Sequence, residues 1–282
     1  MKKSRILCLV IAVLILAAVA VAGFTIHSER AADISGRLTF DLSDGGVCVY
    51  NTNNKEIQKI KINGYSDLEN ITGYNPNEDK VYCTGLQGDK FCVIEAVNGI
   101  AVNSWELSEK PIEIRAVKTE IIVVLSDSVL SINSENGRMN TELRNVTVSH
   151  CFAYENNFVL WGDDYHYVGK VGGDKIIIGA QSQHDSSFEP LCMTSDEILL
   201  IAKDSPLQIC TLDLMTGGVE RANYNMGDTY PVAALGNNII CFYESNYMPQ
   251  CKFYLYQADK DRLLLLDFPD ELLTAKNFEW VE

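Results

Sequence analysis

DKVYCTGLQGDKFCVIEAVNGIAVNSWEL, residues 79–107, contains three short runs of Val, Ile, Tyr, Phe and Cys that are joined by a Gly-Asp turn and an Asn-Gly turn, with Trp105 near the end. Runs of β-branched and aromatic residues that are bounded by Gly, Asn and Asp predict strands. An Asn-Gly pair between two such runs is a strong hairpin signal. The stretch therefore predicts three consecutive antiparallel strands.

Weaker copies of this unit recur along the chain, whereas a helical pattern is nearly absent after residue 24. Similar second turns stand at Asn54, Gly99, Gly137, Gly173, Gly217 and Asp261. Successive turns are 45, 38, 36, 44 and 44 residues apart. A repeat of about 40 residues with four strands is typical of a propeller blade. The spacing therefore predicts an all-β, six-bladed β-propeller.

The strand–turn–strand–turn–strand unit with a terminal Trp resembles the repeat of the pyrroloquinoline-quinone-type propellers, a quinoprotein-like or YVTN-like superfamily. The match is best in 79–107 and extends to 118–144 and 195–225. The resemblance implies a propeller fold over most of residues 36–282. It does not extend to the quinone, because the chain has no adjacent Cys-Cys pair, only three Trp, and six units where the cofactor-using members have eight.

Strand assignment shows how the ring would close. We expect the second unit at 81–86, 90–96 and 101–107, followed by an inner strand at 111–117, and the last unit at 238–244, 250–257 and 261–268. The first unit, 38–43, 46–52 and 56–62, lacks an inner strand, while residues 275–282 lack a blade. We expect 275–282 to pair with 38–43, which would remove exposed sheet edges that favour aggregation.

The N-terminus carries a membrane signal. Lys2, Lys3 and Arg5 precede an uncharged run at 6–24 that is long enough for a helix to cross a bilayer. By the positive-inside rule, residues 1–5 form a cytoplasmic tail, 6–24 a transmembrane signal anchor, 25–35 a linker, and 36–282 a propeller outside the cytoplasm. Ala20 and Ala22 also form an A-x-A pattern, so cleavage as a signal peptide and secretion remain the alternative.

The exported part is strongly acidic. Without the three basic residues of the tail, the chain has 20 Lys and Arg and 38 Asp and Glu, which gives a formal charge near −18. Nucleic-acid affinity comes mainly from Lys and Arg at phosphates, so the charge argues against a nucleic-acid partner. We expect the membrane to be contacted through 6–24 and the propeller to bind a protein or envelope component.

Eight cysteines lie on predicted strands. Folding the hairpins about their turns places Cys83 opposite Cys92 and Cys241 near Cys251, so these pairs could form disulfides. Alternatively, all are buried thiols that act as small hydrophobes. No C-x-x-C or other zinc spacing is present.

An acidic loop face is the candidate ligand site. The loops between the second and third strands of each blade carry Asp44, Asp89, Asp127, Asp163, Asp164, Asp204 and Glu244. Because carboxylate oxygens suit Ca²⁺, a calcium ion could bind there. The densest group, and the candidate metal site, is Asp163, His166, His184 and Asp185. The simpler explanation is ordinary turn chemistry, in which Asp caps local N–H groups.

Linear catalytic motifs, namely G-x-S-x-G, H-E-x-x-H and the phosphate-binding loop, are absent. We therefore expect a non-catalytic binding or scaffold module outside the membrane, with no cofactor unless Ca²⁺ binds. The alternative is a calcium-dependent six-bladed hydrolase or lactonase, which needs three or four carboxylate or amide side chains from different blades to meet on the axis.

Overall fold

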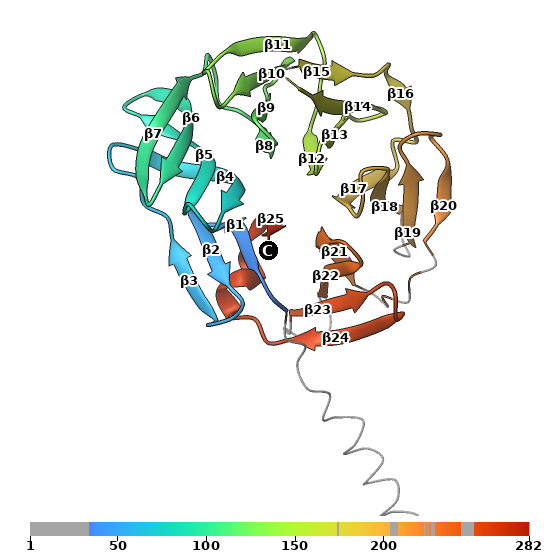
Figure 1. The fold of residues 1–282 in the computed structure, drawn as a ribbon. Helices are drawn as coiled ribbons and strands as arrows, with labels where there is room; N and C mark the ends of the chain where they lie inside the picture. Colours follow the sequence, from blue (N-terminus) through green and yellow to red (C-terminus); the bar gives the residue numbers. More distant parts are fainter. Residues whose placement is uncertain are drawn as a thin grey trace, which may run out of the picture.

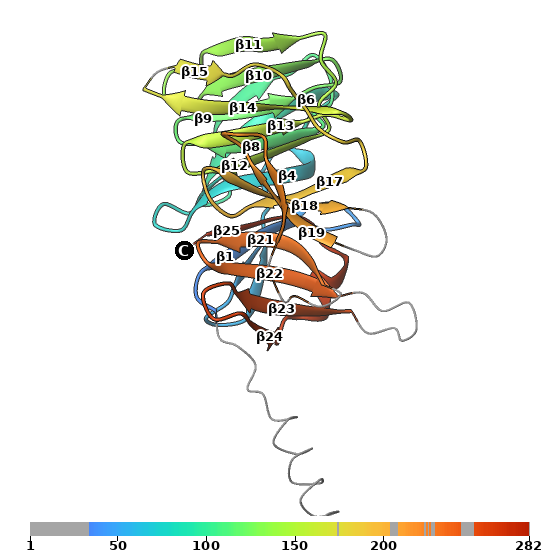
Figure 2. The ribbon, with the colours of Figure 1, turned by 90° about the vertical axis from the view of Figure 1, so that its right-hand side faces the viewer.

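The computed structural model describes residues 34–281 except 174, 204–207, 223, 225, 227–228 and 244–250. Six antiparallel sheets stand around a central axis like the blades of a propeller (Figure 1). The side view shows strands that run across the thickness of the ring, so the connecting loops lie on its two faces (Figure 2). The predicted six-bladed propeller is confirmed.

The first three blades, from the inner strand outward, are as follows. Blade 1 contains β25 (Lys276–Val281), β1 (Arg37–Asp41), β2 (Val47–Asn51) and β3 (Glu56–Lys59). Blade 2 contains β4 (Ser66–Asn75), β5 (Lys80–Gln87), β6 (Lys90–Val97) and β7 (Ile100–Glu106). Blade 3 contains β8 (Glu113–Val117), β9 (Glu120–Val124), β10 (Ser128–Asn133) and β11 (Met139–Arg144).

The other three blades continue around the ring. Blade 4 contains β12 (His150–Tyr154), β13 (Asn157–Trp161), β14 (Tyr165–Gly172) and β15 (Lys175–Ile178), and β16 (Ser182–Gln183) also pairs with β14. Blade 5 contains β17 (Phe188–Met193), β18 (Ile198–Lys203), β19 (Gln208–Asp213) and β20 (Val219–Arg221). Blade 6 contains β21 (Tyr230–Leu235), β22 (Asn238–Tyr243), β23 (Lys252–Gln257) and β24 (Arg262–Leu266), and the 3₁₀ helix η1 (Asp270–Thr274) follows it.

The ring closes as predicted. β25, the last strand, is the inner strand of blade 1 and pairs antiparallel with β1, placing Leu38 opposite Trp280 and Thr39 opposite Glu279. The Trp280 indole N–H also donates a hydrogen bond of 3.1 Å to the Ser35 carbonyl. The two ends of the propeller domain therefore hold each other within one sheet (Figure 1).

The core lies between the blades. Six buried apolar clusters are present in the described part of the chain, one at each contact between neighbouring blades. Strand β13 shows the cause, because Phe158 and Leu160 pack toward blade 3 while Val159 and Trp161 pack toward blade 5. Successive side chains of a strand point to opposite faces, so a strand that is covered on both faces must be apolar throughout.

The described cysteines are free thiols, and all except the half-buried Cys251 are buried. Cys83 lies opposite Ile94 and Cys92 lies opposite Gly85, so the two thiols are offset by two residues across the hairpin. Such diagonal neighbours lie about 7–8 Å apart, which exceeds the usual Cα separation across a disulfide. Cys241 faces Tyr254, three residues beyond Cys251. The buried-thiol alternative is therefore the one that the structure shows.

The predicted tail, anchor and most of the linker, residues 1–33, lie outside the described residues. Among the described residues, no helix combines the length and apolar character needed to cross a membrane.

Candidate functional site

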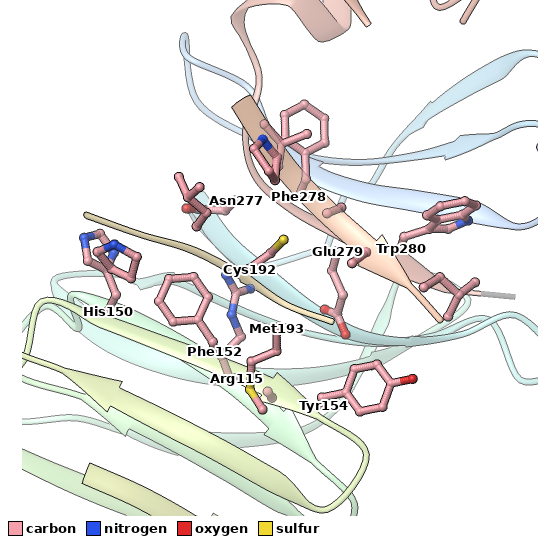
Figure 3. Close-up of a pocket in the computed structure, with 18 of the residues that line it drawn as sticks. Arg115, His150, Phe152, Tyr154, Cys192, Met193, Asn277, Phe278, Glu279 and Trp280 are labelled. Carbon is pink, nitrogen blue, oxygen red and sulfur yellow. The ribbon is translucent and has the colours of Figure 1, made fainter. Parts of the chain in front are cut away.

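A pocket of about 540 Å³ lies on the propeller axis. Its walls come from inner strands β8, β12, β17, β21 and β25, which enter from five different blades (Figure 3). A volume of several hundred cubic ångströms is typical of sites for small ligands or side chains of a partner.

Blade 3 supplies the charged part of the wall. In the β8 sequence Glu-Ile-Arg, Glu113 and Arg115 share one side of the strand, while Ile114 packs into the core toward blade 2. Glu113 Oε1 lies 2.6 Å from Arg115 Nη2, and the two side chains are only 8% and 12% exposed. The ion pair is therefore nearly desolvated, and its stability depends on hydrogen bonds to the remaining polar atoms.

Those hydrogen bonds reach the next blade. Cys151 N on β12 donates to Glu113 Oε2 at 2.9 Å, and Arg115 Nε donates to the Cys151 carbonyl at 2.9 Å. Burial alone would lower the pKa of the Arg115 guanidinium, but the nearby carboxylates, first Glu113 and then Glu279, raise it above its ordinary value. Arg115 thus stays charged and tied to the backbone of blade 4.

Two other contacts between inner strands also consist of a side chain that accepts a hydrogen bond from the backbone of the next blade. Gly73 N on β4 donates to Glu279 Oε2 on β25 at 3.0 Å, and Ala116 N on β8 donates to Thr72 Oγ1 on β4 at 3.1 Å. Side chains near the axis therefore join blades 1 to 4 in sequence. Because these bonds fix neighbouring inner strands to one another, the charged wall is rigid as well as polar.

Asp41 anchors the junction between blades 1 and 2. It accepts hydrogen bonds from Asn70 N at 2.8 Å, Ile71 N at 3.1 Å and Asn277 Nδ2 at 2.7 Å. Burial raises the pKa of this carboxyl group, and the three hydrogen bonds, first that from Asn277, oppose the rise. The Asp41 carboxylate thus accepts hydrogen bonds from groups of the protein itself.

The rest of the wall is mixed, with polar groups at His150, Glu155, Lys276 and Asn277 and several large apolar side chains. The apolar side chains come from blades 4, 5, 6 and 1 and include Phe152, Tyr154, Pro190, Met193, Val232 and Phe278. Figure 3 shows Phe152, Met193 and Tyr154 around the space into which Glu279 extends from β25. A ligand in this pocket would contact carboxylate and guanidinium groups together with apolar side chains.

The acidic loop residues do not line this pocket. Asp44, Asp89, Asp127, Asp163 and Asp164 are exposed on loops between the second and third strands of their blades, whereas Asp204 and Glu244 lie outside the described residues. These loops start one strand away from the inner strand, and neighbouring strands are about 4.8 Å apart. They are therefore set back from the axis, and the acidic face remains a prediction separate from the pocket.

The four residues of the predicted metal site differ in their solvent exposure. Asp163 and Asp185 are exposed, His184 is half-buried, and His166 is only 2% exposed. Among the described residues, no group of three or more His, Cys, Asp and Glu side chains is placed to hold a metal ion. The structure therefore does not bring these four together as a ligand set.

The two histidines instead pack on Trp161. The centroid of the Trp161 ring lies 3.7 Å from that of His184 and 5.7 Å from that of His166. His166 Nδ1 is buried without a hydrogen-bond partner. Burial, and then the nearby His184, lowers the pKa of His166 to about 4, and burial also lowers the pKa of His184. Both rings therefore favour the neutral form.

Sequence reasoning missed the residues that form the pocket. Glu113, Arg115 and Glu279 lie on strands that were predicted as inner strands, at 111–117 and 275–282, but they were not selected as site residues. The available signal was a charged pair with i, i+2 spacing in a predicted inner strand. Such charges point to the same side of the strand and, on an inner strand, lie close to the axis.

Comparisons with known proteins support only the fold. No protein-family model matches the chain, and no curated protein matches it in sequence. TolB from Acinetobacter baumannii matches with a TM-score of 0.57 at 10% identity, over 88% of this chain and 67% of that chain. A protein of unknown function from Bacteroides caccae has a TM-score of 0.55 at 10% identity, over 88% of this chain and 100% of that chain.

A chain in a nidogen/laminin complex also matches, with a TM-score of 0.55 at 10% identity, over 88% of this chain and 99% of that chain. At such low identity a likeness shows the architecture and not the activity. The resemblance to the quinone-type repeat therefore stays an expectation about family, whereas the six-bladed β-propeller fold is shown.

Proposed function

We propose that the chain is a non-catalytic binding or scaffold module, anchored through residues 6–24 and held outside the membrane, whose axial pocket receives part of a protein or envelope partner. The observation that carries the proposal is the axial pocket, which the Glu113–Arg115 ion pair lines together with the apolar side chains of Phe152, Met193 and Val232. A rigid scaffold that presents a concave, partly apolar site is typical of binding proteins.

The charged groups of the pocket support binding over catalysis. Glu113 is paired with Arg115 and with a backbone N–H, and Glu279 accepts a backbone N–H. Groups that are fixed in this way can orient a ligand. A calcium-dependent hydrolase would need several free oxygen ligands on the axis, whereas the pocket carboxylates of Glu113 and Glu279 already accept backbone hydrogen bonds. The geometry therefore favours the binding function.

Site-specific photo-crosslinking tests the site. A benzophenone amino acid is placed at Phe152 in the pocket and, as a control, at Val102, which is 51% exposed on the outer strand β7. In cells that naturally produce the protein, we expect a discrete crosslinked product from position 152 and none from position 102. Products from position 102 alone, or no product from 152, would contradict the proposal.

The membrane anchor needs its own test. Intact cells are treated with an external protease, after removal of any cell wall, and the propeller is followed by immunoblotting. The proposed topology predicts digestion from outside the membrane. Protection from external protease, with digestion only after lysis, would overturn the extracytoplasmic location.

A further inference from the structure

Three sulfur-containing side chains lie together between blades 5 and 6. Cys192 is on inner strand β17, Cys241 is on β22, and Met226 is on the connection from β20 to β21; all three belong to the same buried cluster. Their exposed fractions are 7%, 0% and 2%, respectively. Cys241 Sγ lies 3.8 Å from Met226 Sδ. Cys241 and Met226 are thus in direct contact, and Cys192, whose thiol interacts electrostatically with that of Cys241, is buried in the same cluster.

This cluster has a route to the exterior. Cys192 lines the axial pocket, and Figure 3 shows its side chain at the pocket wall. Cys241 and Met226 do not line the pocket and are buried in the cluster that Cys192 shares with blade 6. An ion that enters the pocket would therefore reach Cys192 first, and binding to the other two sulfur atoms requires local rearrangement of the packed side chains.

The donor set determines which ion would fit. Thiolate and thioether sulfur are soft ligands, which favour monovalent copper over Mg²⁺ or Ca²⁺. Two sulfur ligands that are each about 2.3 Å from one ion lie roughly 3.8–4 Å apart at angles of about 110–120°. The observed separation of 3.8 Å between Cys241 Sγ and Met226 Sδ matches this distance.

We propose that Cys192, Cys241 and Met226 bind one Cu(I) ion, supplied through the axial pocket. This site does not depend on the proposed partner of the pocket. Binding converts two thiols to thiolates and releases two protons, while the Met226 thioether stays neutral and no electron is transferred. The product is a three-coordinate copper centre with sulfur ligands only.

The proton balance makes binding dependent on pH. A bound metal ion displaces the thiol protons directly. Affinity for Cu(I) should therefore increase as pH rises.

Another thiol pair offers a matched control. Cys83 and Cys92 are also buried in one cluster, between blades 1 and 2, at 0% and 2% exposure. No methionine belongs to that cluster. If any pair of buried thiols sufficed, this pair would bind copper equally well.

The test is an anaerobic competition between the reduced full-length chain and the coloured Cu(I)–bicinchoninate complex. The native chain should remove one Cu(I) per molecule, and Cys83→Ser/Cys92→Ser should do the same. Cys192→Ser/Cys241→Ser should remove none. A native chain that removes no copper, or a Cys192→Ser/Cys241→Ser chain that still removes it, overturns the proposal.

Met226→Leu keeps the volume and apolar character of the core, so it separates ligation from folding. It should fold normally and bind Cu(I) at least about tenfold more weakly, since loss of even a supporting group at metal sites costs about this much. X-ray absorption of the native complex should show sulfur neighbours only. Unchanged affinity in Met226→Leu, or nitrogen or oxygen neighbours, contradicts the three-sulfur site.

Discussion

Glu113 Oε1 lies 2.6 Å from Arg115 Nη2 on the same inner strand, and together these side chains bond both backbone groups of Cys151 on the next blade. One ion pair thus shapes the pocket wall and connects blades 3 and 4. Its effect on stability and its role in the pocket can be separated by mutation.

Arg115→Met should lower the free energy of unfolding by about 3–5 kcal/mol, because it leaves the Glu113 carboxylate buried without its partner. Glu113→Leu/Arg115→Met should recover part of the loss, since both charges are then absent. Urea denaturation measures both effects. The control is Lys90→Met, which breaks an ion pair with side chains 57% and 58% exposed and should leave the unfolding midpoint unchanged. Equal effects of Arg115→Met and Lys90→Met would refute the assigned role.

Acid should destabilise the protein partly through His166. Its pKa is about 4 in the folded chain, below the ordinary 6.5, so the unfolded chain binds more protons between these pH values. The free energy of unfolding should therefore fall as pH decreases from 6.5 to 4, by roughly 3 kcal/mol from this group. Above pH 6.5 the contribution is constant.

His166→Phe keeps an aromatic ring against Trp161 but removes the titrating group. Denaturation curves at several pH values should show a smaller acid-dependent loss for this variant than for the native chain. If His166→Phe and the native chain lose stability in parallel, His166 is not the responsible group.

Gly169 on β14 lies directly opposite Phe158 on β13, and a Cβ at Gly169 would overlap the Phe158 ring. Gly169→Ala should destabilise the fold by about 1–3 kcal/mol, as is usual for overpacking. Gly169→Ala/Phe158→Leu should cost less than the sum of the single variants, because the ring is removed. Gly172→Ala, which has room for a Cβ, is the control. Additive costs in thermal denaturation would disagree with this packing.

Removal of β25 should open the ring. A chain that ends at Ala275 loses the inner strand of blade 1 and exposes the edge of β1. We expect aggregation in size-exclusion chromatography and loss of cooperative unfolding, with partial recovery when the peptide KNFEWVE, residues 276–282, is added. A chain that lacks only residue 282 should behave like the native one. A cooperative monomer without β25 would show that closure is dispensable.

The blades were predictable from sequence because their signals are local. The predicted strands at 81–86, 90–96 and 101–107 correspond to β5, β6 and β7, since each run is rich in β-branched or aromatic residues and each turn contains Gly or Asn. Closure through 275–282 followed from counting unpaired strands, and the β25–β1 pairing confirms it.

The pocket was not predictable in the same way. Glu113, Cys151 and Glu279 are brought together by the curvature of the ring, and no local pattern records which inner-strand side chains converge. The Cys83–Cys92 hairpin shows a smaller failure of the same kind. Gln87 pairs with Lys90 across the turn, and in this register Cys83 and Cys92 are offset by two residues instead of lying opposite each other.

Binding of a partner in the axial pocket can be measured as the crosslinking yield at position 152 in a variant whose pocket is filled. Val232→Trp adds bulk to the pocket wall, whereas Val102→Trp adds the same bulk on the outer strand β7. Val232→Trp should abolish the product from position 152, whereas Val102→Trp should leave it unchanged. An unchanged product in the Val232→Trp background, from a protein with native stability, would contradict binding in the axial pocket.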